Sequence, residues 1–249
     1  MIRMRTLVLA SLAVLLLAAA PAGAVIGGTP DRDAHPYVGF AYNPTTDTIC
    51  SGSLISPTLF VTAAHCVAGD GDFVFVTTHP EAIPGHPSFV PGIAHVHPDF
   101  CMGCGNGLPG FDRHDLAVVE LFGGIYSPRY AQLPEPGASQ RLPAKAPLTV
   151  VGYGVQGFFP APGGRQPYTD FTRTTATVEL NPGSFAWRDQ FLRISASKAG
   201  ICFGDSGGPN LVGDTIVAIN AYAGRNCTGN TYSYRLDTPD ALLFIARFQ

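Results

Sequence analysis

A serine set between glycines, in Gly204-Asp205-Ser206-Gly207-Gly208-Pro209, most constrains what this chain can fold into. Flanking glycines allow a sharp turn that exposes the hydroxyl, which becomes a nucleophile only if a base takes its proton. The pattern G-x-S-x-G also occurs in α/β-hydrolases, but there the histidine follows the serine. All seven histidines of this chain precede Ser206. The order histidine, aspartate, serine therefore remains, and the α/β-hydrolase arrangement is excluded.

The composition favours an all-β protein. Hydrophobic residues make up 46 % of the chain, and 29 Gly and 22 Pro residues separate many short apolar runs. In 73–77 both alternating sets are largely apolar, which predicts a strand covered on both faces. Gly213-Asp214 predicts a hairpin turn. We predict strands at 37–42, 59–63, 73–77, 116–121, 148–152, 172–180, 191–195, 211–212 and 215–221.

One helix is predicted at the C-terminus. Thr238 can cap it, Pro239 suits its first position and Asp240 its first turn. The apolar residues on one side of this helix are Leu242, Ile245 and Phe248. The stretch 133–147 holds four prolines and few strand signals, so we expect it to connect two halves of the protein.

Residues 1–24 have the pattern of a secretory signal peptide. Arg3 and Arg5 precede an apolar stretch, and Ala22-Gly23-Ala24 fits a cleavage site. The alternative is a membrane anchor, for which the stretch is short. Cleavage after Ala24 gives a soluble, exported protein, and a rival site after Ala22 leaves a dipeptide to be removed. Loss of the two arginines changes the net charge from −3 to −5, and no basic patch favours nucleic acid as a partner.

Six cysteines suit an oxidising compartment, and the sequence alone permits 15 pairings. Cys101 and Cys104 form a C-x2-C pair that could join His95 and His97 in a zinc cluster. The spacing does not match a standard zinc site, and the expected chemistry needs no metal. We therefore favour a small disulfide loop there.

The base and the acid of a catalytic triad are predicted beside apolar strands. His65 follows one such run, in Thr62-Ala63-Ala64-His65-Cys66, and Asp115 begins another. In this interpretation Ser206 attacks a carbonyl, His65 transfers the proton and Asp115 holds the imidazole. The backbone N–H groups of Gly204 and Ser206 would face the oxyanion. Asp112 is a rival acid without an apolar strand directly after it, and His114 is a neighbour rather than the base.

The runs TAAHC, DLAVVEL and GDSGGP, in that order and spacing, resemble the chymotrypsin-like (trypsin-fold) serine proteases from Val25 to Gln249. The resemblance implies two antiparallel six-stranded β-barrels, at about 25–132 and 148–237, with the active site between them and a C-terminal helix at about 238–249. It implies disulfides Cys50–Cys66 and Cys202–Cys227, which leaves Cys101–Cys104 as a pair outside the family pattern. In the family the loop before Asp115 borders the cleft, so we expect this insertion to restrict subsites.

The resemblance also implies how the enzyme is activated. Val25-Ile26-Gly27-Gly28 resembles the mature N-terminus of the family, whose new α-amine pairs with the aspartate before the catalytic serine, here Asp205. Because Ala24 directly precedes Val25, export itself could generate the amine without a propeptide.

The expected substrate pocket lacks a charge. Gly200 stands where trypsins carry an aspartate, so a basic residue before the scissile bond (P1) is not expected. Tyr222 matches the aromatic residue of the substrate-binding strand, and Ala223 and Thr231 stand where open pockets have glycines, which favours a small or medium apolar P1. Ala221 replaces a serine that usually supports the catalytic aspartate.

We therefore predict a secreted, monomeric serine endopeptidase that acts on proteins or peptides through an acyl-enzyme. It would need no cofactor or metal and, after signal cleavage, would not associate with membrane or nucleic acid. Two alternatives remain: a catalytically weak homologue that acts by binding, and an esterase that uses the same triad.

Overall fold

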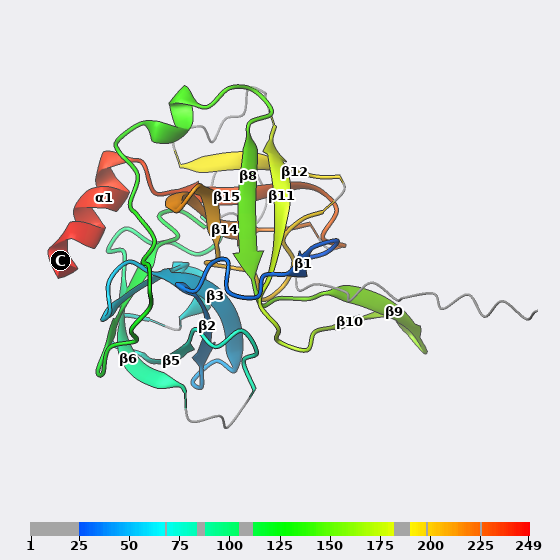
Figure 1. Ribbon diagram of the computed structural model, residues 1–249, viewed down its shortest axis with the longest axis horizontal. Coiled ribbons are helices and arrows are strands. Elements are labelled where there is room, and N and C mark those ends of the chain that lie inside the picture. Colours follow the sequence, from blue (N-terminus) through cyan, green and yellow to red (C-terminus); the bar gives the residue numbers. More distant parts are fainter. Residues whose placement is uncertain are drawn as a thin grey trace, which may run out of the picture.

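The computed structural model describes residues 25–67, 69–83, 88–104, 112–181, 190–197, 199–224 and 226–249. The predicted signal peptide, residues 1–24, lies outside the described residues. Within the described ranges, each helix is too short or too polar to span a bilayer. Strands make up most of the regular secondary structure of the described residues, which forms two closed six-stranded antiparallel barrels and a short C-terminal helix (Figure 1); this confirms the predicted all-β fold.

The first barrel closes in the order β2-β3-β4-β7-β6-β5. Its strands are β2 (Val38–Asn43), β3 (Thr48–Leu54), β4 (Leu59–Thr62), β5 (Phe73–Thr77), β6 (Val90–Val96) and β7 (Ala117–Leu121). In β5, Val74 and Val76 are buried in the barrel, but Phe73 is 53 % exposed and packs edge-to-face on Phe122. The expectation that both faces are covered was therefore wrong at Phe73, because a barrel buries only its inner face.

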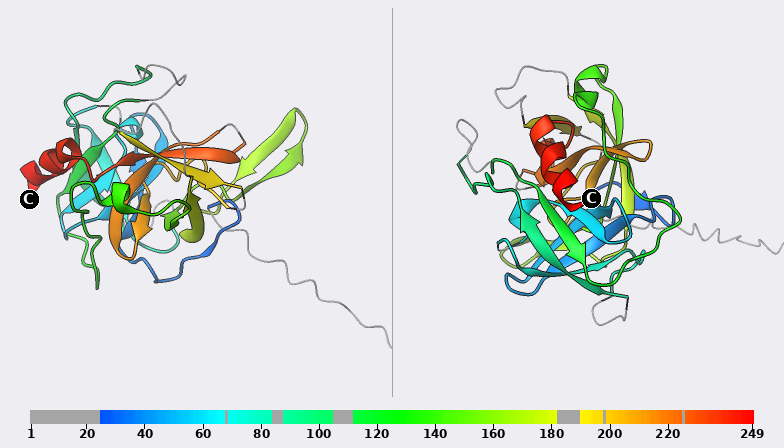
Figure 2. Two further views of the ribbon diagram at one scale, coloured as in Figure 1. Left: turned by 90° about the horizontal axis from the view of Figure 1, so that it is seen from above. Right: turned by 90° about the vertical axis from the view of Figure 1, so that its left-hand side faces the viewer.

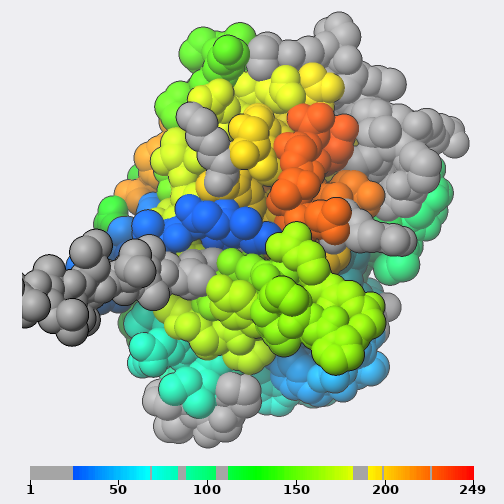
Figure 3. All heavy atoms as spheres, turned by 90° about the vertical axis from the view of Figure 1, so that its right-hand side faces the viewer, coloured from blue at the N-terminus to red at the C-terminus, as the bar shows by residue number. Residues whose placement is uncertain are grey.

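The second barrel closes because β8 pairs with both β13 and β11. Its strands are β8 (Pro147–Gly152), β11 (Thr174–Leu180), β12 (Phe191–Ala196), β13 (Pro209–Val212), β14 (Thr215–Tyr222) and β15 (Gly229–Arg235). The short β1 (Thr29–Pro30) pairs with β11. A hairpin of β9 (Gly157–Ala161) and β10 (Gly164–Tyr168) projects from the body (Figure 2), and the chain from residue 25 (blue) runs between it and the barrel strands (Figure 3).

A buried arginine joins the two halves. Arg173, just before β11, is fully buried, and its Nε donates to Asp31 at 2.9 Å. Its Nη1 donates to the carbonyl oxygens of Val38 and Thr78 in the first barrel, at 3.1 and 2.8 Å. A guanidinium offers five N–H donors in a rigid fork, so one side chain can satisfy several acceptors at the boundary between the barrels.

The C-terminal helix α1 (Pro239–Ile245) begins as the sequence predicts. Thr238 Oγ1 accepts the N–H of Ala241 at 3.2 Å, and Pro239 occupies the first turn. Phe244 is buried, and its ring lies 4.9 Å from that of His97, at the end of the first barrel. The helix therefore follows the second barrel in sequence but packs against the first.

Candidate active site

Strand register brings His65 and Asp115 together. β4 and β7 are antiparallel neighbours, with Thr62 opposite Ala117. His65 lies in a single 3-10 turn, η1 (Ala64–Cys66), directly after β4, and Asp115 lies two residues before β7. Both residues therefore lie at the same end of one strand pair. A disulfide from Cys66 to Cys50 of β3 ties the histidine turn to the barrel.

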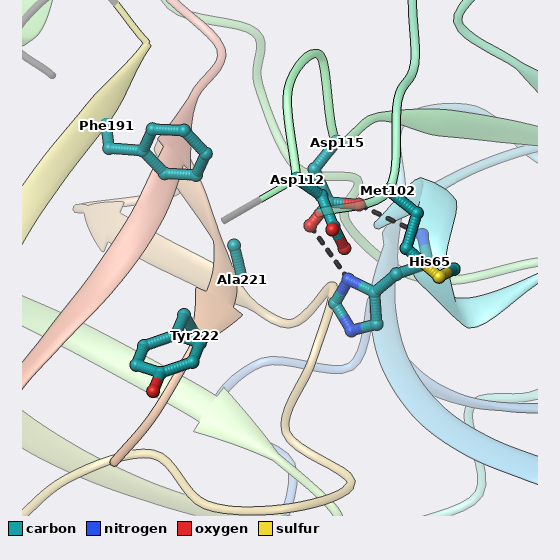
Figure 4. A pocket seen from close by; sticks show the side chains of 7 residues that line it. All are labelled: His65, Met102, Asp112, Asp115, Phe191, Ala221 and Tyr222. Atoms are coloured by element: carbon teal, nitrogen blue, oxygen red, sulfur yellow. Dashed lines mark hydrogen bonds and ion pairs between the residues drawn. The ribbon is translucent and has the colours of Figure 1, made fainter. Parts of the chain in front are cut away.

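His65 forms hydrogen bonds to both oxygens of the Asp115 carboxylate. Its Nδ1 lies 2.8 Å from Oδ2, and its backbone N–H donates to Oδ1 at 2.9 Å (Figure 4). Asp115 is only 1 % exposed. Because an ionised carboxylate only accepts hydrogen bonds, Nδ1 must carry a proton, which leaves Nε2 of the neutral ring as a proton acceptor. His65 thus has the tautomer that a general base requires.

A second carboxylate lies beside this pair. The acceptor atoms of Asp112 and Asp115 and a ring nitrogen of His65 all lie within 4.8 Å of one another. Asp112 also accepts the backbone N–H of Gly103, but the hydrogen bonds of His65 go to Asp115. Of the two candidate acids, Asp115 therefore has the geometry that orients the ring.

The two carboxylates set the protonation of His65. Burial alone lowers the pKa of His65, but the charge and hydrogen bond of Asp115, with the charge of Asp112, outweigh burial and raise it. The pKa of Asp112 is itself raised, chiefly by burial and further by the charge of Asp115, against the opposing effects of Gly103 and His65. The site therefore stabilises an imidazolium, which a base must become when it takes a proton.

The Ser206 turn belongs to the second barrel but lies against the first. Ser51 of β3 donates its N–H to the Ser206 carbonyl at 2.8 Å. Gly207 has φ +77°, and a Cβ there would overlap Thr62 Oγ1 and lie 2.8 Å from the nitrogen of Ala63, so only glycine fits. The serine is thus beside the segment that leads into His65. Among the described residues, no hydrogen bond joins the Ser206 hydroxyl to His65.

A cleft of about 320 Å³ opens beside His65. Its lining residues are His65, Met102, Asp112, Asp115, Phe191, Ala221 and Tyr222 (Figure 4). Sequence reasoning missed Met102 and Phe191 as cleft residues. Met102 belongs to the short loop closed by the Cys101–Cys104 disulfide, so that loop does border the cleft, and the C-x2-C pair was its signal.

The predicted pocket residues lie in different places. Tyr222 lines the cleft, whereas Thr231 of β15 is 1 % exposed and pairs with Ile194 of β12. A Cβ at Gly200 would overlap Cβ of Ala196, so this position has no room for a larger side chain unless its neighbour moves. Ala223 follows β14 and is partly buried.

The segment expected to activate the enzyme is already beside the second barrel. Ile26 and Gly200 exchange two backbone hydrogen bonds of 3.0 Å, and the amide N–H of the buried Val25 donates to Thr174 Oγ1 at 2.7 Å. In this uncleaved chain the Val25 nitrogen is an amide, so the predicted ion pair with Asp205 is not formed.

Asp205 is buried without a cationic partner among the described residues. Its two oxygens accept the N–H groups of Gly154 and Cys202, at 2.9 and 2.8 Å. Burial nevertheless raises the pKa of Asp205 to about 7, despite the opposing effect of these two bonds. Cys202 is tied to Cys227 by a disulfide, which fixes one side of the serine turn.

Two antiparallel barrels, with a histidine–aspartate pair beside a glycine-flanked serine turn, define the class of chymotrypsin-like serine proteases. The trypsin family model matches residues 25–240, so the chain belongs to the trypsin family and is a serine endopeptidase.

Similar proteins agree with this assignment. A trypsin of Phaedon cochleariae is 30 % identical over 74 % of this chain and 71 % of its own length. Neutrophil elastase of Mus musculus is 26 % identical over 98 % of this chain and 87 % of its own. The solved structure of HL collagenase superposes with a TM-score of 0.70 at 17 % identity, covering 90 % of this chain and 98 % of that one, which shows the shared fold.

Proposed function

We propose that the chain is a secreted endopeptidase that cleaves proteins or peptides through a Ser206 acyl-enzyme, with His65 as the base and Asp115 as the residue that orients it. His65 Nε2 takes the Ser206 proton as Oγ bonds to the carbonyl carbon. It then returns that proton to the leaving amine as the C–N bond breaks, and water releases the acyl group by the reverse proton path. The observation that carries this proposal is the pair of hydrogen bonds between His65 and Asp115. The hydrogen bond from a catalytic serine to its histidine, which the described residues do not form here, often tightens only when substrate binds.

The oxyanion would be held by backbone N–H groups of the serine turn. Among the described residues, the N–H groups of Gly204 and Ser206 donate to no other protein group, whereas those of Asp205, Gly207 and Gly208 do. Gly204 has φ +91°, which a residue with a side chain rarely adopts. One such donor is worth roughly 3–4 kcal/mol of barrier.

The proposed preference for a small or medium apolar P1 rests on Ala223 and Thr231, which stand where open pockets have glycines. A basic P1 is not expected, because the predicted pocket base has no carboxylate. Ala196 and Gly200 lie within contact distance of each other at this pocket base, and neither residue carries a charge. A carboxylate at position 200 would also overlap Ala196. Substrates with Lys or Arg at P1 would therefore lose a charge partner and be disfavoured.

Activation would follow removal of the residues before Val25, and cleavage of the signal peptide during export would itself remove them. The new amine would compensate the buried charge of Asp205, which now has only two N–H donors. The segment from Val25 is already hydrogen-bonded, through Ile26, to Gly200 in the segment that leads to Asp205. N-terminal sequencing of the exported protein tests this directly, because active enzyme that begins at Gly23 would contradict it.

The function is tested by labelling with a fluorophosphonate, which reacts only with an activated serine. The mature protein should be labelled at Ser206 in a 1:1 ratio, while Ser206→Ala and His65→Ala are not labelled and lose roughly 10⁶-fold in kcat. Absence of labelling in the correctly processed protein would indicate a binding protein. Matched amide and ester substrates separate a peptidase from an esterase, and a peptide library then gives the P1 preference.

A further inference from the structure

Two stacked histidines connect the Asp115 turn to the C-terminal helix. The rings of His97, at the end of β6, and His114, beside Asp115, lie 4.9 Å apart and are inclined by 19°. Both face one oxygen of Asp240 on α1: His97 Nε2 lies 3.3 Å and His114 Nδ1 2.9 Å from Oδ2. His97 is only 3 % exposed. These three residues, which we call the histidine clamp, come from three separate parts of the chain.

The remaining contacts fix the tautomer of each ring. The N–H of Asp99 donates to His97 Nδ1 at 3.2 Å, so the proton of the neutral ring sits on Nε2, facing Asp240. The N–H of His114 donates to Gln190 Oε1, which orients the Gln190 amide so that its Nε2 donates to His114 Nε2. The proton of His114 therefore sits on Nδ1, also facing Asp240.

These tautomers favour a hydrogen-bonded clamp over a metal site. A metal at the centre would need lone pairs on the same two nitrogens that carry protons here. The His97 ring also resists a second proton, because that proton would oppose the N–H of Asp99. Burial first, and the neighbouring His114 and Arg247, lower the pKa of His97 against the charges of Asp240 and Asp99.

The histidine clamp acts on the backbone that carries Asp115. His114 has φ +50°, an uncommon conformation for a residue with a side chain. Its carbonyl accepts the N–H of Leu116 at 2.8 Å, so Asp115 is the apex of a three-residue turn. The N–H of His97 donates to the Leu116 carbonyl at 3.0 Å, on the other side of that turn. The clamp thus holds the Asp115 turn from both flanks.

We propose that His97, His114 and Asp240 are positioning residues that hold Asp115 at its hydrogen-bonding distance from His65. The proposal rests on the proposed role of Asp115 in catalysis. None of the three side chains is among those that line the described cleft with His65, so they act through the Asp115 turn and do not contact substrate. A clamp of this kind matters because a misplacement of about 1 Å can cost roughly 100-fold in rate.

The test compares two changes that break the clamp with one that keeps part of it. Asp240→Asn replaces the charged oxygen that both rings face with a neutral amide, and His114→Ala removes a donor and the ring stack. His114→Asn keeps a donor and a residue type that adopts positive φ readily. We expect kcat to fall about 10- to 100-fold for the first two, with KM within about twofold, and to recover substantially in His114→Asn. The matched control is Glu120→Gln, which breaks the exposed pair between Glu120 and His95 on neighbouring strands.

The acid limb of kcat/KM gives a readout that a purely structural role would not move. Asp115 raises the pKa of His65, so its displacement should shift that limb to lower pH in Asp240→Asn and leave it unchanged in Glu120→Gln. Unchanged kcat and acid limb in both clamp-breaking variants would overturn the proposal. So would loss of wild-type activity in EDTA that zinc restores, with Asp240→Asn insensitive to both. If Ser206→Ala remained active, the proposed function would fail instead.

Discussion

The buried carboxylate of Asp205 predicts that stability depends on whether the chain begins at Val25. Burial raises the pKa of Asp205 to about 7 from an ordinary value of 3.8. Such a group binds more protons in the folded state, so the uncleaved chain loses stability as pH rises from about 4 to about 7. At 1.36 kcal/mol per pKa unit, the full shift of about three units corresponds to about 4 kcal/mol.

A free amine at Val25 would cancel part of this loss by pairing with the carboxylate. For a domain of this size, 4 kcal/mol corresponds to roughly 8–16 °C in melting temperature, which is an upper limit because the amine must also be desolvated. The amine pKa should rise on pairing, so this stability is complete below its unfolded value near 8 and is lost as pH rises through the folded value. Activity of the mature enzyme should fall in the same alkaline range.

The assay compares a chain that begins at Val25 with one extended by a few residues, both carrying Ser206→Ala to prevent self-digestion. Melting curves by calorimetry at pH 5 and pH 8 should show the larger difference at pH 8, where Asp205 is ionised in the extended form. Asp205→Asn in both forms should remove the pH dependence of that difference. An equal difference at the two pH values would refute the reasoning.

Three further predictions concern single residues. Asp112→Asn should shift the acid limb of kcat/KM to lower pH, because the charge of Asp112 raises the pKa of His65, and an unshifted limb would exclude that influence. Gly207→Ala should reduce kcat by roughly 100-fold or more, because its Cβ would overlap Thr62 in a backbone with positive φ; a kcat close to that of the wild type would show that the turn can move. Arg173→Met should destabilise the protein by about 3–5 kcal/mol in urea unfolding, because it removes the buried guanidinium that pairs with Asp31 and satisfies the carbonyl groups of Val38 and Thr78. Adding Asp31→Asn should recover part of that loss.

Two of the strands that sequence patterning missed, β3 and β15, carry polar residues that hold the barrels together. β3 contains two serines and a glycine, which reads as a loop. In the structure Ser51 Oγ donates to the Gly204 carbonyl at 2.9 Å and accepts the Tyr153 N–H at 3.0 Å. β15 is polar for a similar reason, since Ser233 accepts from Asn210 in a buried network. Alternating apolar patterns identify a strand covered by its own barrel, but not one whose side chains satisfy buried polar groups.

The residues of the candidate site were likewise predicted only in part. The order of the histidine, aspartate and serine, with an apolar run beside His65 and another beside Asp115, was enough to predict the His65–Asp115 pair, because both residues were expected at strand ends near a cleft. The flanking apolar runs carried no signal for Met102 or Phe191 on the cleft wall. Their positions depend on a small disulfide loop and on how the second barrel packs against the first. Nor could spacing predict that Asp240 would meet His114, because they are 126 residues apart and meet only when α1 returns to the first barrel.

Each half of the molecule supports a turn of the other half that carries a residue of the proposed triad. The Ser206 turn belongs to the second barrel, but Ser51 and Thr62 of the first barrel support it. The Asp115 turn belongs to the first barrel, but Gln190 and Asp240, from the second half of the chain, support it through His114. Neither barrel could therefore assemble the proposed triad alone, because each contributes groups that the other must position. This reciprocal support explains why polar residues gather at the barrel boundary, where hydrogen bonds fix relative position more strictly than apolar packing does.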